Sequence, residues 1–348
     1  MKNSLVSIVI PNFNNGPLLK EMIDCIQHQS YKYWELWIVD DGSTDNSVQL
    51  VNDYAESDGR IHLFCRNRLP KGGQTCRNIG KDCCRGEYVV FFDSDDLIAP
   101  WCLEQRVTFM NSYPEIDYGI FPAHSFKTGN DPYVKQKTNV GFGEKSVKDP
   151  LDKFLRNEYP HTVWTNMYRR NSIVDINWDE KVLVRQDFDY NVTNLINGKK
   201  YAFCTTAKYD YFYRGAFGLN NVSKSFTTPT KCKSMIYLFD KIISQLEKMS
   251  EKKCKQYKLA IRHYIVHHYT SLIQQTNKET CKEYIDFCQQ HFDRWFIIRL
   301  KVIDIIVRPI RIESLKFIMT YFVTLLLFWY KFYFIIIGKQ IRKVYYRL

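Results

Sequence analysis

The sequence predicts an α/β fold in which a mostly parallel, doubly wound sheet is flanked by helices and followed by a helical extension. Short apolar runs alternate with amphipathic helical segments over residues 5–92, the order expected for parallel strands joined by helical crossovers. Two of these runs lead directly into groups of carboxylates. Beyond residue 231 the pattern changes to long helices with apolar residues at helical spacing.

The elements follow one another in a regular order. Strands are expected at 5–10, 34–39, 61–64, 88–92 and 118–121, and helices over 17–29, 45–57, 74–84, 101–112 and 187–197. Ser43 and Thr44 are the expected caps of the second helix. Gly72 and Gly73, at the start of the third helix, allow a ligand to approach the backbone closely.

Composition narrows the classes of protein. The chain has 348 residues, enough for a catalytic domain and an extension. A net charge of +12 favours an anionic partner such as nucleic acid, a membrane surface or a phosphorylated substrate. The 11 cysteines form no Cys-x-x-Cys pair, which argues against a zinc site. The first residues contain no long apolar core of a signal peptide, so reduced thiols in the cytoplasm are expected.

The run at 88–92 ends in the carboxylates Asp93, Asp95 and Asp96. In open α/β sheets, ligands bind at the carboxyl ends of the strands. Asp93 and Asp95 are two residues apart and point the same way if the chain is extended, so a cation between them is expected. Oxygen ligands favour Mg²⁺ or Mn²⁺. A solvated acidic turn, with Asp96 as a helix cap, is the alternative.

Four segments resemble the family 2 glycosyltransferases. They are 6–14, 39–45, 72–80 and 92–96. Cys76 stands where an alanine is common in that family. Their order and spacing together carry the resemblance, since each one alone is too short to be specific.

The resemblance covers residues 5–225 and implies a GT-A fold that binds a nucleotide-diphospho-sugar together with Mn²⁺ or Mg²⁺. It implies a role for each matching position: Pro11 and Phe13 line the base pocket, Asp41 accepts a hydrogen bond from a pyrimidine base, Arg77 reaches the base or diphosphate, Asp93 holds the ribose or metal, and Asp95 is the main metal ligand. Asp41 as a turn residue and Arg77 as the partner in a surface ion pair remain the alternatives.

The segment 185–190 resembles the family's catalytic stretch, which usually reads Glu-Asp. Gln186 replaces the Glu, and Asp187 keeps the position of the catalytic base, with Asp189 as the fallback. A sugar hydroxyl needs one carboxylate to take its proton, and a single base is sufficient for an inverting transfer. Loss of the neighbouring Glu is expected to leave the pKa of Asp187 less raised than in relatives. The alternative is that Asp187 caps its helix.

Two further segments resemble parts of the family near the acceptor and at the end of the catalytic domain. In 163–170, Trp164 is positioned to stack on an acceptor sugar or to pack in the core. In 211–214, Arg214 either contacts the diphosphate or forms a structural ion pair. Residues 127–150 show little periodicity and are expected to form a mobile loop over the acceptor side.

Three domains are expected: a catalytic domain (1–225), a helical extension (226–290) and basic, apolar membrane-associating helices (291–348). Within the last, 313–337 approaches spanning length, but a narrow polar stripe and basic residues on both flanks favour helices that lie at an anionic membrane surface. A true span and a buried helical pair or dimer interface are the alternatives.

Together these features predict an inverting glycosyltransferase at the cytoplasmic face of the inner membrane, peripheral or C-terminally anchored. It moves a sugar from a UDP-sugar to a hydroxyl of a glycan or lipid-linked glycan in bacterial surface polysaccharide assembly. A polyprenyl-phosphate glycosyltransferase and a non-catalytic nucleotide-sugar-binding scaffold are the alternatives, and an oligomer is compatible with the sequence. Nucleic acid is disfavoured because the basic residues concentrate at the apolar C-terminus without a recognised motif.

Overall fold

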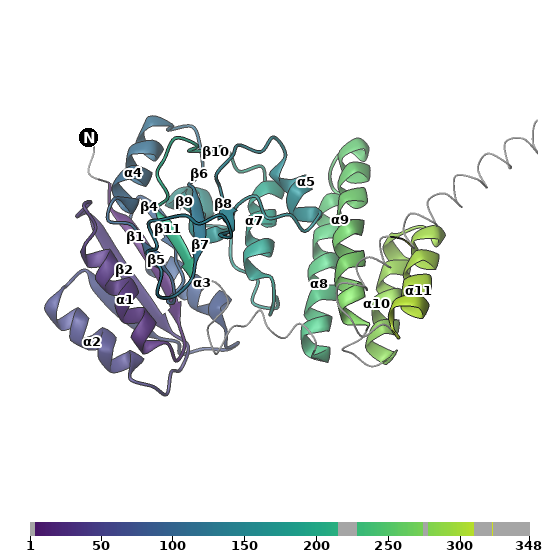
Figure 1. The fold of residues 1–348 in the computed structure, drawn as a ribbon, viewed down its shortest axis with the longest axis horizontal. Helices are drawn as coiled ribbons and strands as arrows, with labels where there is room; N and C mark the ends of the chain where they lie inside the picture. Colours follow the sequence, from purple (N-terminus) through teal and green to yellow (C-terminus); the bar gives the residue numbers. More distant parts are fainter. Residues whose placement is uncertain (1–3, 215–227, 274–277, 310–321, 323–348) are drawn as a thin grey trace, which may run out of the picture. The chain divides into compact units, whose positions relative to one another are not determined.

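The chain forms two compact units in a computed structural model that describes residues 4–214, 228–273, 278–309 and 322 (Figure 1). One unit comprises 1–154 with 158–222, and the other 155–157 with 223–348. The first is an α/β unit and the second is helical.

A seven-stranded sheet in the order β10-β6-β9-β4-β1-β2-β3 is the centre of the α/β unit. Its strands are β1 (Val6–Asn12), β2 (Trp34–Asp40), β3 (Ile61–Cys65), β4 (Tyr88–Phe91), β6 (Tyr118–Ile120), β9 (Asn166–Arg169) and β10 (Tyr201–Phe203). The pairs β1–β2, β1–β4, β2–β3 and β6–β10 are parallel. Strand β9 is antiparallel to both β4 and β6. The predicted mostly parallel sheet flanked by helices is therefore confirmed, with one reversed strand that was not predicted.

Five of the helices over residues 1–222 lie close to their predicted positions, and the short helices α5 and α6 were not predicted. The helices are α1 (Gly16–Gln27), α2 (Ser47–Ser57), α3 (Gly73–Cys83), α4 (Cys102–Ser112), α5 (Pro150–Leu155), α6 (Arg170–Ile173) and α7 (Gln186–Ile196). Helix α3 packs closely on β1 because it carries Gly80, where an added Cβ meets Val9 Cγ1 at 2.4 Å. Alternation along the strands puts Ile8 in the core on one face of the sheet and Val9 in the core on the other.

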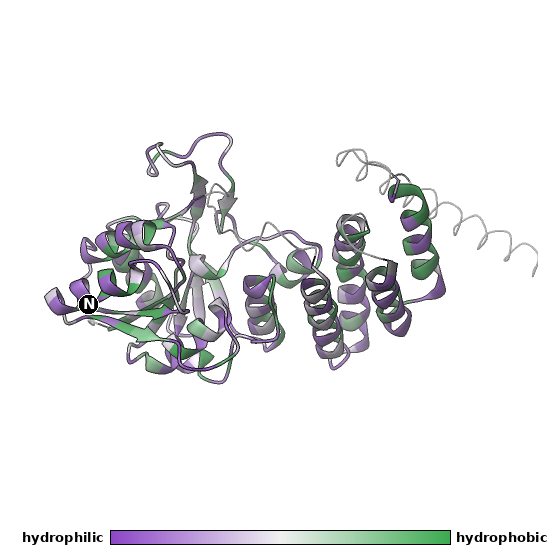
Figure 2. Ribbon diagram, turned by 90° about the horizontal axis from the view of Figure 1, so that it is seen from below, coloured by the Kyte–Doolittle hydropathy of each residue, from purple (hydrophilic) through white to green (hydrophobic). Residues whose placement is uncertain are grey.

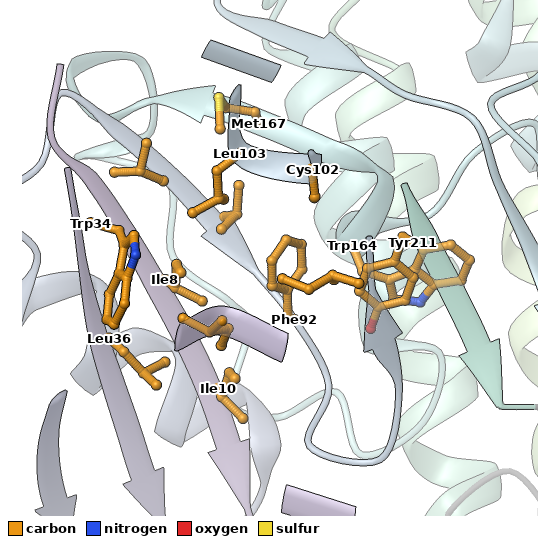
Figure 3. Packing of buried hydrophobic residues seen from close by; sticks show 14 of the residues in the cluster. Ile8, Ile10, Trp34, Leu36, Phe92, Cys102, Leu103, Trp164, Met167 and Tyr211 are labelled. Atoms are coloured by element: carbon orange, nitrogen blue, oxygen red, sulfur yellow. The ribbon is translucent and has the colours of Figure 1, made fainter. Parts of the chain in front are cut away.

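A second, four-stranded sheet was not predicted. Its order is β5-β11-β7-β8, formed by β5 (Leu97–Ile98), β7 (Ala123–Phe126), β8 (Gly141–Phe142) and β11 (Tyr211–Arg214). Phe92, Trp164 and Tyr211 belong to the same buried cluster as Ile8 of the large sheet, as Figure 3 shows. Strand β8 falls within 127–150, which was expected to be irregular.

The helix cap predicted at Ser43 and the alternative cap at Asp96 are not formed. The residue before α2 is Asn46, and the Ser43 hydroxyl donates to Asp40 Oδ2 at 2.5 Å instead of capping the helix. Asp96 is followed by β5 and accepts hydrogen bonds from β11. Ser43 thus bonds the last residue of the strand before its own loop, and Asp96 bonds the neighbouring strand β11.

The helical unit contains α8 (Pro229–Leu246), α9 (Glu251–Leu272), α10 (Lys278–His291) and α11 (Arg294–Val307), in agreement with the long helices expected beyond residue 231. Its helices carry apolar residues on one face and polar residues on another, visible as green and purple bands in Figure 2. No helix among the described residues has the length and apolarity needed to cross a membrane. Of the predicted membrane segment 313–337, all but Phe322 lies outside the described residues.

Candidate active site

The carboxyl ends of β1, β2 and β4 meet at one edge of the sheet, because the three strands are parallel neighbours. Asn12, Asp40 and Phe91 are the last residues of these strands. The segments that resemble the glycosyltransferase family therefore converge at this edge.

Asp40 organises the loop after β2. Its Oδ1 accepts the backbone amides of Gly42 at 2.9 Å and Ser43 at 2.8 Å, and its Oδ2 accepts Asn12 Nδ2 at 3.0 Å. The residue is 2% exposed. Such a saturated, buried carboxylate fixes the loop and is not available to a ligand, so the next residue is the one presented at the edge.

Every hydrogen bond that the structure describes for the Asp41 carboxylate ends on Oδ1. The donors are Arg66 Nε at 2.5 Å, the Gly72 amide at 3.2 Å and Cys76 Sγ at 3.7 Å. Burial, followed by the charge of Asp41, raises the pKa of the Cys76 thiol to about 12, so that it keeps its proton and donates. With Oδ1 occupied, Oδ2 is left to accept an N–H group from a ligand.

Pro11 and Phe13 lie at the end of β1, where they were predicted to line a base pocket. Pro11 is half-buried, while the ring of Phe13 is 41% exposed with Lys71 Nζ 3.5 Å from its centroid. Gly72 has a φ of +142°, and an added Cβ meets the Gln74 side chain at 2.6 Å. The loop before α3 therefore requires glycine at this position.

Arg77 connects the strand-end loops to helix α7. Its Nη2 donates to Asp93 Oδ1 at 2.6 Å, and its Nη1 donates to Gln186 Oε1 at 3.3 Å. The guanidinium lies 4.6 Å from the ring centroid of Trp178. Arg77 is thus held by residues of three segments, a buried arrangement that excludes the surface ion pair as its only role.

The N-terminus of α7 is fixed by side-chain contacts. Gln186 Nε2 donates to Gln74 Oε1 at 2.6 Å. Gly73 leaves room for the Arg77 guanidinium, because an added Cβ lies only 3.1 Å from Nη1. Arg185, immediately before the helix, has a left-handed φ of 59°. The turn that begins α7 therefore places residues 186 and 187 beside Arg77.

Asp187 lies close enough to Arg77 and Asp93 to interact electrostatically with both. Burial raises the pKa of its carboxyl to about 6, Arg77 acts to lower it, and Asp93 acts to raise it. No hydrogen bond to the Asp187 carboxylate is found in the described part of the chain. Asp187 lies in the first turn of α7, but Arg185 is the residue at the cap position. A half-buried carboxylate with a raised pKa at such an edge has the properties of a general base.

The loop after β4 differs from the extended geometry that was expected. The strand ends at Phe91, and a turn includes Ser94 and Asp95. Asp95 and Asp93 still interact, because burial and then the Asp93 charge raise the pKa of Asp95 to about 6.

Asp96 has a structural role. It is fully buried and accepts Tyr211 Oη at 2.7 Å and the Arg214 amide at 2.7 Å. Tyr211 Oη in turn accepts the Asp93 amide at 3.2 Å. Burial raises the pKa of Asp96 well above the ordinary range, followed by the charges of Asp95 and Asp93. These bonds tie the acidic loop to β11.

The two remaining carboxylates of the loop fit a divalent cation bound jointly with substrate phosphates. In the described residues, no donor from another residue hydrogen-bonds to the Asp95 carboxylate, and the neighbouring negative charge of Asp93 is compensated by Arg77 alone. Among the same residues, no group of three or more His, Cys, Asp or Glu is arranged to hold a metal. One or two carboxylates completed by phosphate oxygens is the usual environment of Mg²⁺.

Arg214 and Trp164 are both engaged by the protein. Arg214 Nε donates to the Asp95 carbonyl at 2.8 Å, and its Nη2 pairs with Glu21 Oε2 at 2.6 Å. Trp164 is 4% exposed and stacks on Tyr211 with centroids 4.6 Å apart. These contacts favour the structural ion pair for Arg214 and the packed-core alternative for Trp164.

Sequence reasoning missed Gln74, Trp178 and Glu180. Asn78 Nδ2 donates to the Trp178 carbonyl at 2.9 Å and to Glu180 Oε1 at 2.9 Å, which places Trp178 beside Arg77. The segment 177–180 has no periodicity of its own. Its one signal was an isolated tryptophan, which also fits an ordinary core residue.

The sheet order is that of a GT-A fold, and its acidic edge lies at the carboxyl ends of β1, β2 and β4. The family model described as Glycosyl transferase family 2 matches residues 7–176. The resemblance to the family 2 glycosyltransferases that was read from the four segments is therefore confirmed over residues 7–176.

Relatives and solved structures agree with this assignment. An uncharacterized glycosyltransferase of Haemophilus influenzae is 39% identical over 110 residues, which are 32% of this chain and 44% of the relative. An Escherichia coli protein named UDP-Glc:alpha-D-GlcNAc-diphosphoundecaprenol beta-1,3-glucosyltransferase WfgD is 28% identical over 194 residues, 51% of this chain and 75% of that protein. The crystal structure of S. aureus TarS 1–349 in complex with UDP-GlcNAc aligns with a TM-score of 0.65 and 18% identity, covering 85% of this chain and 86% of that chain. The TarS likeness shows the fold.

Proposed function

We propose that the protein is an inverting glycosyltransferase that moves a sugar from a UDP-sugar to a hydroxyl of a glycan or lipid-linked glycan in surface polysaccharide biosynthesis. One observation carries this proposal: Arg77 bonds both Asp93 of the acidic loop and Gln186, the neighbour of Asp187. A group suited to the donor and a group suited to the acceptor are thereby held at one edge of the sheet.

Asp41 and Phe13 are the proposed base-binding residues, with Pro11 and Gly72 beside them. Uracil presents one imide N–H, which matches the single oxygen that Asp41 leaves open. The exposed Phe13 ring offers a face for stacking. The names of WfgD and of the TarS complex, which mention UDP-Glc and UDP-GlcNAc, support a uridine nucleotide.

Asp93 and Asp95 are the residues proposed to hold Mn²⁺ or Mg²⁺. When bound, the cation neutralises the charge that develops on the departing diphosphate. Arg77 supplies a fixed positive charge at the same place, and its contact with Asp93 keeps that carboxylate in position.

Asp187 is the proposed base. With a pKa of about 6 it is mostly ionised at pH 7 and able to take the proton of the acceptor hydroxyl. The hydroxyl oxygen forms its bond to the anomeric carbon as the bond from that carbon to the diphosphate breaks. A single displacement of this kind inverts the configuration at the anomeric carbon.

The acceptor is proposed to be lipid-linked, which places the enzyme at the cytoplasmic face of the inner membrane. Support comes from the sequence of 291–348, where apolar and aromatic residues are flanked by basic ones. The WfgD name, which includes a diphosphoundecaprenol acceptor, is consistent with such a substrate.

Two experiments test the proposal. Screening a panel of nucleotide sugars for diphosphate release, with and without Mn²⁺, identifies the donor, and UDP binding without any turnover would favour the non-catalytic scaffold. In the Asp187→Asn enzyme the proposal expects severe loss of transfer. Largely intact turnover would favour a polyprenyl-phosphate glycosyltransferase, whose phosphate acceptor needs no base.

A further inference from the structure

Two arginines of the helical unit lie close enough to interact without sharing a counter-charge. Arg262 belongs to α9 and Arg299 to α11. Arg262 lies over the rings of Phe292 and Phe296, 5.3 and 5.2 Å from their centroids. Arg299 is one helical turn from Phe296, on the side of α11 that also carries the buried Ile303. Because the Arg262 guanidinium of α9 lies over Phe296, one turn from Arg299, the two arginine positions are neighbours where α9 and α11 pack.

The two arginines differ in their partners. Arg262 Nη2 pairs with Asp293 Oδ2 at 2.7 Å, and Asp293 also caps α11. Among the described residues, Arg299 has no hydrogen bond and no ion pair. Within the residues that the structure describes, the Nε atoms of both arginines are buried without an acceptor. Buried guanidinium donors normally have acceptors, so the pair leaves unsatisfied donors and net positive charge.

The electrostatics agree with this geometry. Burial, followed by the positive charge of Arg262, lowers the pKa of Arg299 to about 10. Asp304, the acid within α11, is engaged by Arg308 at 2.6 Å. Outside the described residues the sequence contains a single acidic residue, Glu313. Within the described residues, Arg299 is therefore left without an acidic partner.

We propose that Arg262 and Arg299 form a binding site for a phosphate-type anion. A guanidinium presents a planar fork of donors that matches phosphate oxygens, and two forks facing one anion satisfy both Nε–H groups and remove the like-charge repulsion. A free phosphorylated ligand and a phospholipid headgroup have this chemistry in common. The site belongs to the helical unit and does not depend on the proposed transfer reaction.

Thermal unfolding of the full chain in phosphate and in chloride at equal ionic strength tests the site. If the dissociation constant is about 4 mM, then ~20 mM phosphate is expected to raise the unfolding midpoint of the helical unit by about 2–4 °C. Hydrogen exchange in 255–272 and 294–307 reports whether the protection lies at the two helices.

Three variants locate the effect. Arg299→Leu is expected to be at least as stable as wild type without phosphate, because it removes an unpaired buried charge, and to lose the phosphate response. Arg299→Lys keeps the charge but lacks the fork, so its response is expected to be reduced. Lys301→Leu, a matched loss of charge at an exposed position of α11, is expected to respond like wild type.

A phosphate response that persists in Arg299→Leu, or is absent from wild type, overturns the proposal. It is also overturned if only Glu313→Gln responds to phosphate, since Glu313 then fills the site. Sedimentation with phosphatidylglycerol or phosphatidylcholine vesicles distinguishes the source. Weaker binding of Arg299→Leu than of Lys301→Leu to phosphatidylglycerol indicates a headgroup, and equal binding together with the soluble phosphate response indicates a free phosphorylated ligand. Donor hydrolysis is expected to be unchanged in Arg299→Leu, which separates this result from a failure of the catalytic proposal.

Discussion

Opposing influences act on the carboxyl of Asp187. Burial and the charge of Asp93 raise its pKa, and Arg77 lowers it. Because the pKa is near 6, the base is ionised at pH 7 and becomes protonated as the pH falls through 6. We expect kcat/KM to decrease about tenfold per pH unit below this midpoint, measured at saturating Mn²⁺ so that Asp95 is not titrating freely.

The control for this profile is Asp187→Asn, which keeps the shape of the side chain but cannot accept the proton. Its kcat is expected to fall by about 10²–10⁴-fold. The KM for the donor should change little, and the residual rate should show no acid limb with a midpoint near 6. An unchanged limb in this variant would assign the titration to another group.

Gln186 sets the charge balance around Arg77. As an amide it accepts from Arg77 without adding a negative charge. In Gln186→Glu, a second carboxylate pairs with Arg77 and weakens its effect on Asp187, so the acid limb of kcat/KM is expected to move to higher pH. Gln186→Met, which removes the hydrogen bonds without adding charge, serves as the control, and an equal shift in both variants would contradict this electrostatic account.

At the scale of elements, α4 is joined to the second sheet by a fully buried ion pair. Arg106 donates to Asp210 through Nε at 2.9 Å and Nη2 at 2.7 Å, and both side chains are 0% exposed. Asp210→Asn leaves the arginine uncompensated, so we expect a loss of about 3–5 kcal/mol in the free energy of unfolding. Denaturant titration measures it, and Arg106→Met combined with Asp210→Leu should recover part of the loss.

A buried histidine couples the packing of α5 and the large sheet to pH. The ring of His161 lies 5.0 Å from Phe154 and 6.0 Å from Phe203, and burial lowers its pKa to about 3 from 6.5. A lowered folded-state pKa means that stability is fully present above pH 6.5 and lost as the pH falls towards 3. The expected contribution is about 1.4 kcal/mol per pH unit in that window, roughly 2 kcal/mol lost at about pH 5.

His161→Phe isolates this contribution, because phenylalanine fills a similar aromatic site and does not titrate. The difference in unfolding free energy between the variant and wild type should grow as the pH is lowered from 6.5. A difference that stays constant between about pH 7 and 4 would show that His161 is not the linked group.

For the whole molecule, two compact units with separate cores predict two thermal transitions in calorimetry. At a hundredfold excess over its dissociation constant, UDP with Mn²⁺ should stabilise the α/β unit by about 2.7 kcal/mol. It should therefore raise the transition temperature of that unit only. Phosphate should raise the transition temperature of the helical unit. A single transition that moves with either ligand would show that the units unfold together.

The sequence by itself determined the order of the large-sheet strands and the helices in the first 120 residues, the acidic edge and the resemblance to the glycosyltransferase family. These follow from local signals, since apolar periodicity, glycine positions and carboxylates after strands act over a few residues. The second sheet and the antiparallel direction of β9 could not be predicted from the sequence, because the pairing of short strands depends on residues that are distant in the chain.

Only the tertiary structure decided which of the marked residues act together. Arg77 meets Gln186 across 109 positions of sequence, and Trp164 becomes buried because Tyr211 stacks on it. Likewise, the tertiary fold made Asp40 and Asp96 structural and left Asp41 and Asp95 with open oxygens. The sequence does not show whether the oxygens of a carboxylate accept hydrogen bonds from other residues. Those donors are brought to the carboxylate only when the chain folds.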